Sequence, residues 1–111
     1  MIFSSIGCGP TKAALPPQAY AALEEALVEK NKAERDIRLY TNLDWTIIRP
    51  GVLRSEPATG KAMLTENVLS FGTIHRADVA ALIIRALGTD KEYTRKEFSA
   101  IDASLGPLPS T

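Results

Sequence analysis

The chain of 111 residues is long enough for one domain and too short for two. Its 13 basic residues balance its 13 acidic residues, which argues against a nucleic-acid groove or an anionic membrane surface as a partner. A single cysteine excludes a disulfide within the chain, and no apolar run approaches the roughly 20 residues of a membrane span. We therefore expect a cytoplasmic protein without a metal site.

The first segment predicts a short strand followed by a proline-rich connector. Ile2–Ile6 reads as the strand, and Gly7-Cys8-Gly9-Pro10 breaks it. The two glycines suggest a dinucleotide-binding loop, but Lys12 stands where the third glycine belongs and Pro10 interferes with a helix start, so we reject that interpretation. Because the only histidine, His75, is distant in sequence, Cys8 is interpreted as a small residue beside a turn rather than a nucleophile.

A long helix is predicted from Gln18 to Tyr40, where the chain is rich in Ala, Leu, Glu, Lys and Arg. Its apolar stripe is interrupted by Lys30 and Glu34, which are spaced i, i+4. One explanation is an exposed ion pair that contributes about 0.3–0.5 kcal/mol. The other is a lysine that points into a ligand site and is held there by the glutamate. Periodicity alone favours the first.

The most informative stretch is Trp45–Ile48, a nearly unbroken run of bulky β-formers. Such a run predicts a strand buried on both faces of a parallel sheet. Pro50 removes a ladder donor and Gly51 permits positive φ, so we expect the chain to turn out of the sheet there. Open α/β sheets bind ligands at the carboxyl ends of such strands, although an ordinary core strand would show the same pattern.

The remaining segments predict a second helix and a final strand. Arg76–Leu87 has a wide apolar face, with Asp78 in its first turn, Gly88 closing its end and His75 as a cap or surface residue before it.

Between these elements the sequence is less regular. A loop is expected over 54–60, and 62–65 and 68–71 could be strand or irregular. Lys96–Ile101 alternates well enough for an edge strand, and residues 103–111 are expected to form a disordered tail.

Four motifs carry a resemblance to a known family. In chain order they are Ser4-Ser5-Ile6-Gly7, Lys30-x-x-x-Glu34, Leu43-Asp44-Trp45-Thr46-Ile47-Ile48-Arg49-Pro50-Gly51-x-Leu53 and Ile74-His75-Arg76-Ala77-Asp78-Val79-Ala80. With this order, the chain resembles the C-terminal half of the atypical short-chain dehydrogenase/reductases that bind NAD(P)H. The similarity is greatest to the branch that contains biliverdin IX-beta reductase and the nitrogen-metabolite-regulator-like proteins.

The resemblance implies a fold and a set of site residues. The fold class is α/β: residues 1–102 would form the C-terminal part of a Rossmann-like parallel sheet with flanking helices, with the N-terminal nucleotide-binding half missing. NADP or NAD would be the cofactor. The family likeness places the nicotinamide beside Ser4, Ser5, Pro50, Gly51, Val52 and Leu53. Lys30 would be the catalytic residue, contacting the ribose or orienting a small-molecule substrate, and the loop 54–71 would shape the substrate pocket.

Two departures from the family pattern define the functional hypotheses. The glycine-rich phosphate loop is absent, and the tyrosine of the Tyr-x-x-x-Lys pair would fall at Ala26 before Lys30. One hypothesis is the substrate half of a reductase acting on a flavin, quinone or similar molecule, inactive alone. The other is a non-catalytic regulatory or assembly module. Either implies self-association or a missing N-terminal half, because a sheet edge and apolar helix surface would face water.

Overall fold

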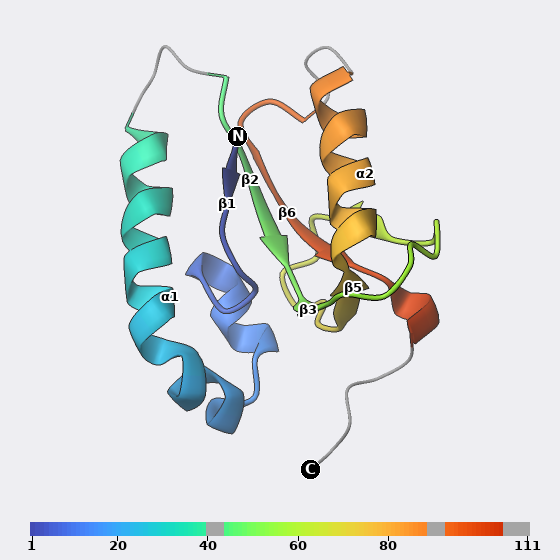
Figure 1. The fold of residues 1–111 in the computed structure, drawn as a ribbon. Helices are drawn as coiled ribbons and strands as arrows, with labels where there is room; N and C mark the ends of the chain where they lie inside the picture. The colour runs from blue at the N-terminus through green and yellow to red at the C-terminus, as the bar shows by residue number, and fades with distance from the viewer. Residues whose placement is uncertain (40–43, 89–92, 106–111) are drawn as a thin grey trace.

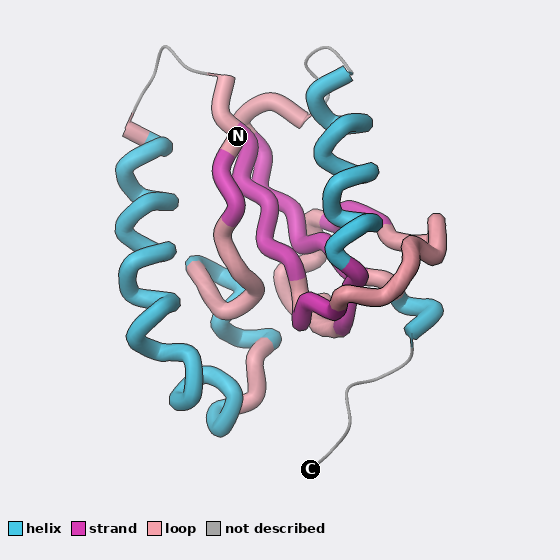
Figure 2. The backbone as a smooth tube through the Cα atoms, in the orientation of Figure 1, coloured by secondary structure: helices cyan, strands magenta, loops and turns pink. Residues whose placement is uncertain are grey.

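The computed structural model describes residues 1–39, 44–88 and 93–105. In this part of the chain, α1 (Pro17–Arg38) and α2 (Arg76–Gly88) cover opposite faces of a four-stranded sheet (Figures 1 and 2). The strand order is β1-β2-β6-β4, with the first three parallel and the last antiparallel. These strands are β1 (Ile2–Phe3), β2 (Thr46–Pro50), β6 (Lys96–Ile101) and β4 (Met63–Thr65).

A second, smaller sheet extends from the carboxyl end of β2. It consists of β3 (Val52–Arg54) and β5 (Thr73–His75), which are parallel. Two short 3-10 helices complete the described elements, namely η1 (Gly9–Ala14) and η2 (Ala103–Leu105). The helix η2 shows that the first part of the expected disordered tail is ordered, and residues 106–111 lie outside the described part of the chain.

The central strand β2 confirms the prediction of a strand buried on both faces, because all five of its residues are buried. On the α2 face, Ile48 packs in one apolar cluster, whose other buried members are Ile74, Val79, Leu82 and Ala100. On the other side of the molecule, Cys8, Leu15 and Leu27 form a second cluster beneath α1. This arrangement is the three-layer α/β order that a parallel sheet requires.

The last strand corrects one expectation. β6 lies inside the sheet between β2 and β4 rather than at an edge. Ser99 and Ala100 each have partners on both neighbouring strands. Local alternation does not reveal how many neighbours a strand has, because pairing on each side depends on distant segments.

Gly51 corrects another expectation, since it does not adopt the positive φ that its sequence context suggested. The chain instead passes directly from β2 into β3, and backbone hydrogen bonds hold it on both sides of this junction. Gly51 N–H donates to the Ala100 carbonyl at 3.0 Å, and Val52 N–H donates to the Gly72 carbonyl at 2.9 Å. A Cβ on Gly51 would lie 2.1 Å from the Gly72 oxygen, so the glycine is required by close backbone approach.

The helices lie close to their predicted bounds, but α1 buries a narrower face than predicted. Only Leu27 and Glu34 are fully buried along α1, whereas Leu23 is 45% exposed. The predicted end of this helix at Tyr40 and the turn at 41–42 lie outside the described residues. Because so little of α1 is buried, its docking depends on a few contacts.

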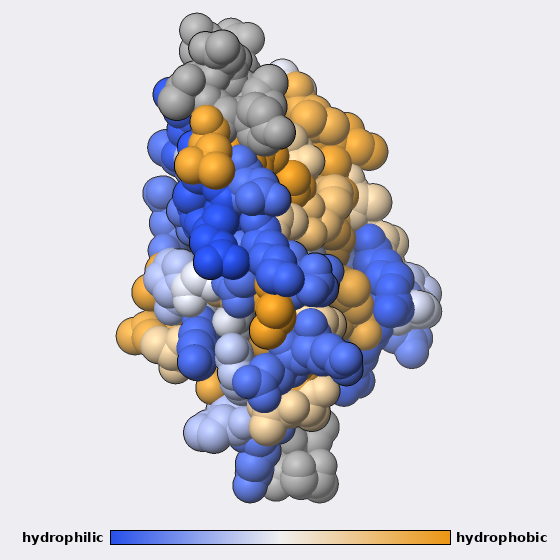
Figure 3. All heavy atoms as spheres, turned by 90° about the vertical axis from the view of Figure 1, so that its left-hand side faces the viewer, coloured by the Kyte–Doolittle hydropathy of each residue, from blue (hydrophilic) through white to orange (hydrophobic). Residues whose placement is uncertain are grey.

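The strand β1 ends the sheet. It pairs with β2 on one side, and no described strand pairs with its other side. Phe3 on this strand is 47% exposed and Met1 before it is 36% exposed. Figure 3 shows hydrophobic residues gathered beside the hydrophilic surface of α1 on this side of the molecule. An unpaired strand edge with exposed apolar residues is a template for association with another strand.

We predict that Gly51→Ala destabilises the protein, because the new methyl group must displace the Gly72 carbonyl. The free energy of unfolding in urea should fall by at least about 2 kcal/mol. Gly88→Ala is the matched control, since a Cβ at that helix end meets no atom within 4 Å and should be neutral or slightly stabilising. Equal unfolding midpoints for the two variants would contradict this account.

Candidate active site at the carboxyl ends of the strands

The structure brings together the predicted site residues of β1 and β2. Ser4 N–H donates to the Ile48 carbonyl at 2.8 Å, and Ile6 N–H donates to the Pro50 carbonyl at 3.1 Å. Backbone pairing therefore continues past the end of β1 and holds Ser4 and Ser5 beside the last residues of β2. This is the edge at which open parallel sheets bind their ligands.

The Ser4 hydroxyl is a polar group without a partner. Ser4 is 6% exposed, and its buried Oγ meets no hydrogen-bond geometry among the described residues, although the weak Cys8 thiol lies close enough for Ser4 to lower its pKa. The neighbouring Ser5 Oγ, in contrast, donates to the Ile6 carbonyl at 3.0 Å. A buried polar group without a partner costs about 1–3 kcal/mol, so Ser4 is the hydroxyl that a ligand at this edge could satisfy.

The crossing from β2 to β3 supplies apolar surface at the same edge. Val52 and Leu53 are 43% and 41% exposed, although both are large hydrophobic residues at the start of a strand. Pro50 is buried. A buried hydroxyl and exposed aliphatic side chains therefore occur at the same edge of the sheet.

The loop after β1 is closed to phosphate, as the sequence predicted. Gly7 N–H donates to Thr11 Oγ1 at 2.9 Å, and Gly9 N–H donates to Asn31 Oδ1 at 2.9 Å. The amide between them, of Cys8, donates to the Ser5 carbonyl at 3.1 Å. All three amides are therefore used within the protein, and the short η1 helix that follows is not the α-helix that a dinucleotide loop precedes. This loop therefore offers no free amide to a pyrophosphate.

Both explanations of the Lys30–Glu34 spacing are wrong in pairing these two residues with each other. Glu34 is 1% exposed and accepts two hydrogen bonds from Arg49, at 3.0 Å from Nε and 2.6 Å from Nη2. Lys30 is half-buried and forms no ion pair with Glu34 among the described contacts. The glutamate serves the central strand rather than the lysine, because a guanidinium offers a carboxylate two parallel bonds.

Arg49 joins three elements through this contact. Its Nη2 also donates to Glu97 Oε1 on β6 at 2.6 Å, and Arg38 of α1 lies 2.9 Å from the same carboxylate. Burial lowers the pKa of Arg49, but the hydrogen bonds that it donates to Glu34 and Glu97 reverse this effect and raise it overall. One feature of the sequence could have indicated this network, because an arginine inside an otherwise apolar strand needs a buried acid as a partner.

The structure confirms the interpretation of Cys8 as a packing residue. The side chain is fully buried, and Sγ lies 3.7 Å from the Leu27 carbonyl as a weak donor. Burial raises the pKa of the Cys8 thiol, and the opposing effect of Ser4 is smaller. A neutral, buried thiol is a poor nucleophile.

A second polar cluster, missed from the sequence, fixes the loop after β3. Asp78 accepts from the backbone amides of Thr59 at 2.9 Å and Gly60 at 3.0 Å, so it serves this loop instead of its own helix. Thr59 Oγ1 donates to Asp102, whose pKa is raised by burial but lowered overall by hydrogen bonds from Ser104 and Thr59. His75 is buried, contrary to expectation, and its Nδ1 lies 2.9 Å from the Pro57 carbonyl.

Two searches of the described residues concern other kinds of site. No group of three or more His, Cys, Asp or Glu residues in them could hold a metal ion. No helix within 1–39, 44–88 or 93–105 is long and apolar enough to cross a membrane.

Comparison with known proteins identifies relatives of this chain. Residues 1–90 match the family model described as NAD(P)H-binding. The chain is 39% identical over 88 residues to the uncharacterized sugar epimerase YhfK of Bacillus subtilis, covering 79% of this chain and 38% of that protein.

Solved structures are also similar to this chain. ChuY from Escherichia coli CFT073 superposes with a TM-score of 0.86 at 37% identity, over 95% of this chain and 56% of that one. ChuY from Escherichia coli O157:H7, described as an anaerobilin reductase, gives 0.85 at 36% identity, over 96% of this chain and 50% of that one. The chain thus spans about half the length of these two structures.

Removal of the Glu34 carboxylate should strongly destabilise the fold, because Arg49 would lose its bidentate partner in the interior. We expect Glu34→Ala to lower the free energy of unfolding by about 3–5 kcal/mol. Glu29→Ala on the same helix removes only an exposed pair with Lys32 and should cost less than about 0.5 kcal/mol. Urea unfolding measures the stability of both variants. Similar losses of unfolding free energy would show that the buried Arg49–Glu34 contact stabilises the protein no more than the exposed pair does.

The ion pairs of Glu97 also predict a dependence of stability on pH. Burial raises the pKa of Glu97, but hydrogen bonds from Arg38 and Arg49 lower it overall, below its ordinary 4.5. The native state therefore gains stability from this carboxylate above pH 4.5 and loses it as the pH falls through the depressed value. The stability difference between wild type and Glu97→Gln should be largest near neutral pH and shrink towards about pH 3. A difference that is constant with pH would contradict the assignment.

Proposed function

The chain belongs to the NAD(P)H-binding family, and from that premise we propose that it forms the substrate half of an NAD(P)H-dependent reductase. The observation that carries the proposal is the buried, unpartnered Ser4 hydroxyl at the carboxyl end of β1. In the described part of the chain, this hydroxyl is left unsatisfied at the edge where such sheets bind ligands, and the matching family binds NAD(P)H.

Each of the proposed site residues has a separate role. Ser4 and Ser5 border the carboxamide side of the nicotinamide, while Pro50, Gly51, Val52 and Leu53 form the surface against which its ring lies. Lys30 projects from α1, half-buried and without an ion pair to Glu34, and it contacts the ribose or orients the substrate. A bound nicotinamide supplies a hydride, and the second proton of the reduction comes from solvent or substrate.

Binding of the whole cofactor requires residues that the described chain does not offer. The amides of the loop after β1 are used internally, so the pyrophosphate needs a separate glycine-rich segment. The free edge of β1 is the place where a nucleotide-binding half would add its strand. We infer that the chain alone is inactive and works with such a half.

The substrate class follows from the relatives. One matching structure is described as an anaerobilin reductase, and the exposed aliphatic surface of Val52 and Leu53 suits a flat conjugated molecule. A flavin, a quinone or a comparable molecule is the proposed acceptor. The competing proposal is a non-catalytic regulatory or assembly module, with which the closed loop after β1 is equally compatible.

A fusion experiment distinguishes these two functions. The segment of the Escherichia coli anaerobilin reductase that precedes its matched region is joined to this chain, and NADPH binding is followed by fluorescence. The fusion should bind NADPH at least about tenfold more tightly than the chain alone and should oxidise NADPH in the presence of FMN or menadione. Tight binding without turnover of either acceptor, in a folded fusion, would support the module instead.

Two lysines on the same helix test the assignment of the catalytic residue in that fusion. Lys30→Ala should lower kcat/KM at least about tenfold, because it removes a group placed at the cofactor. Lys32→Ala should leave kcat/KM unchanged, since Lys32 is exposed and pairs with Glu29. If both variants keep full activity, Lys30 has no role in the reaction.

A further inference from the structure

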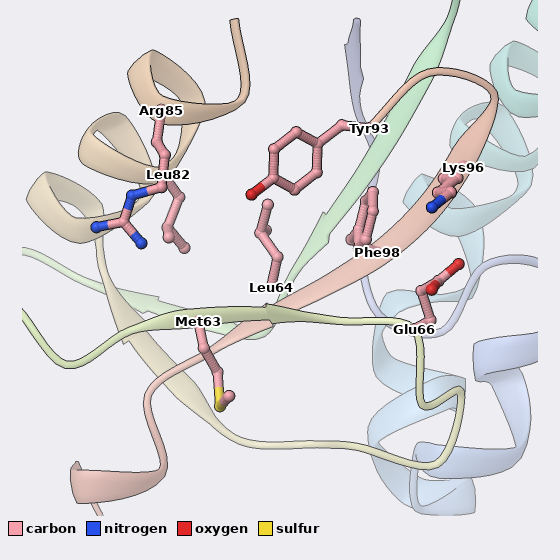
Figure 4. Close-up of a pocket in the computed structure, with 8 residues that line it drawn as sticks. All are labelled: Met63, Leu64, Glu66, Leu82, Arg85, Tyr93, Lys96 and Phe98. Carbon is pink, nitrogen blue, oxygen red and sulfur yellow. The ribbon is translucent and has the colours of Figure 1, made fainter. Parts of the chain in front are cut away.

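The molecule has a cavity that the proposed reductase site does not use. It has a volume of about 330 Å³ and lies between the edge strand β4, the amino half of β6 and the later turns of α2 (Figure 4). Its lining residues are Met63, Leu64, Glu66, Leu82, Arg85, Tyr93, Lys96 and Phe98. The volume lies at the lower end of the range for small-molecule sites.

This cavity is at the opposite edge of the sheet from Ser4. Its strand residues belong to β4, which ends the sheet on one side, and to β6, whereas Ser4 follows β1 at the other edge. The central strand β2 therefore lies between the two sites. A ligand here would not compete with one at the carboxyl ends.

Packed apolar side chains form part of the cavity lining, beside the charged Glu66, Arg85 and Lys96. Leu82 and Phe98 are 5% and 7% exposed, so both side chains are fixed by packing behind the cavity. Tyr93 packs edge-on against Phe98, with ring centroids 5.3 Å apart and planes at 65°. Figure 4 shows Leu64 and the Tyr93 ring facing the same space from β4 and from the segment before β6. Such walls suit a planar ring.

Three lining residues carry hydrogen-bond donors, namely Arg85, Tyr93 and Lys96. Among the described residues, the Tyr93 hydroxyl makes no hydrogen bond, and Lys96 makes no ion pair, although Glu66 also lines the cavity. In Figure 4, the Tyr93 hydroxyl points toward Leu82 and Arg85, while Lys96 stands on the far side of Phe98. Donors at the rim of an apolar space favour a ligand that carries an anionic oxygen.

We propose that this cavity binds a small planar molecule that carries a carboxylate, with its ring against Leu64 and Phe98 and its carboxylate at Lys96 or Tyr93. The site does not depend on the proposed reductase activity, because none of its residues lies at the carboxyl ends of β1 and β2. It would add a second ligand to the domain.

The test uses naphthalene-2-carboxylate as the probe and 2-naphthylmethanol as its uncharged counterpart. Two-dimensional amide NMR of the wild-type chain should show shifts at Leu64 and Phe98, and none at Ser4. The dissociation constant should be about 1 mM or lower, as expected for a probe of this size. The alcohol should bind at least about fivefold more weakly, because it lacks the charge that Lys96 attracts.

Four variants test whether the probes bind in this cavity. Leu64→Trp fills the cavity and should abolish binding of both probes, whereas Leu69→Trp places the same ring on an exposed loop position and should not. Lys96→Gln should weaken carboxylate binding about fivefold without affecting the alcohol, and Lys61→Gln on the distant loop should change neither. The same spectra report whether each variant is folded. Absence of shifts at about 5 mM probe, or binding that survives Leu64→Trp in a folded variant, would overturn the proposal.

Discussion

The buried contact between Arg49 and Glu34 determines how this domain is assembled. It places a charged pair, each residue 1% exposed, between the central strand and a helix that buries little else. Two charges are tolerated there only if their bidentate geometry is met, which restricts α1 to one position along β2. The loop after β1 adapts to the same contact, because a Cβ on Gly9 would lie 2.8 Å from Arg49 Nη2. The position of Ser4 therefore depends on an interaction several residues away.

Two regions of the sheet have different characters. At the carboxyl ends of β1 and β2, the Ser4 hydroxyl makes no hydrogen bond among the described residues and the aliphatic side chains of β3 are exposed, while Asp78 and Asp102 hold the following loop in place. At the β4 edge, a cavity lined in part by Tyr93 and Phe98 opens between β4, β6 and α2. Both features come from the same three layers, but the first is shared with a family that binds NAD(P)H and the second is a property of these side chains.

The free edge of β1 connects the fold to the length of the relatives. A parallel sheet covered by helices on both faces normally continues until its edge is protected, and here the described sheet stops at a strand with exposed Phe3. The matched structures are about twice as long as this chain, with the superposition covering 50% and 56% of them. The proposed nucleotide-binding half would join the sheet at this edge.

The sequence by itself determined the local elements, since their signals are local. The apolar β-formers of β2 and the helix-forming stretches of α1 and α2 were predicted close to their observed bounds, and the missing third glycine predicted a loop that does not bind phosphate. Only the tertiary structure decided the partners. Gly51 is needed because Gly72 approaches it, β6 is interior because β4 returns to it, and Glu34 turns to Arg49 rather than to Lys30 on its own helix. Each of these depends on a contact between distant segments, and spacing along one segment carries no information about which distant group will satisfy a buried charge or a free backbone edge.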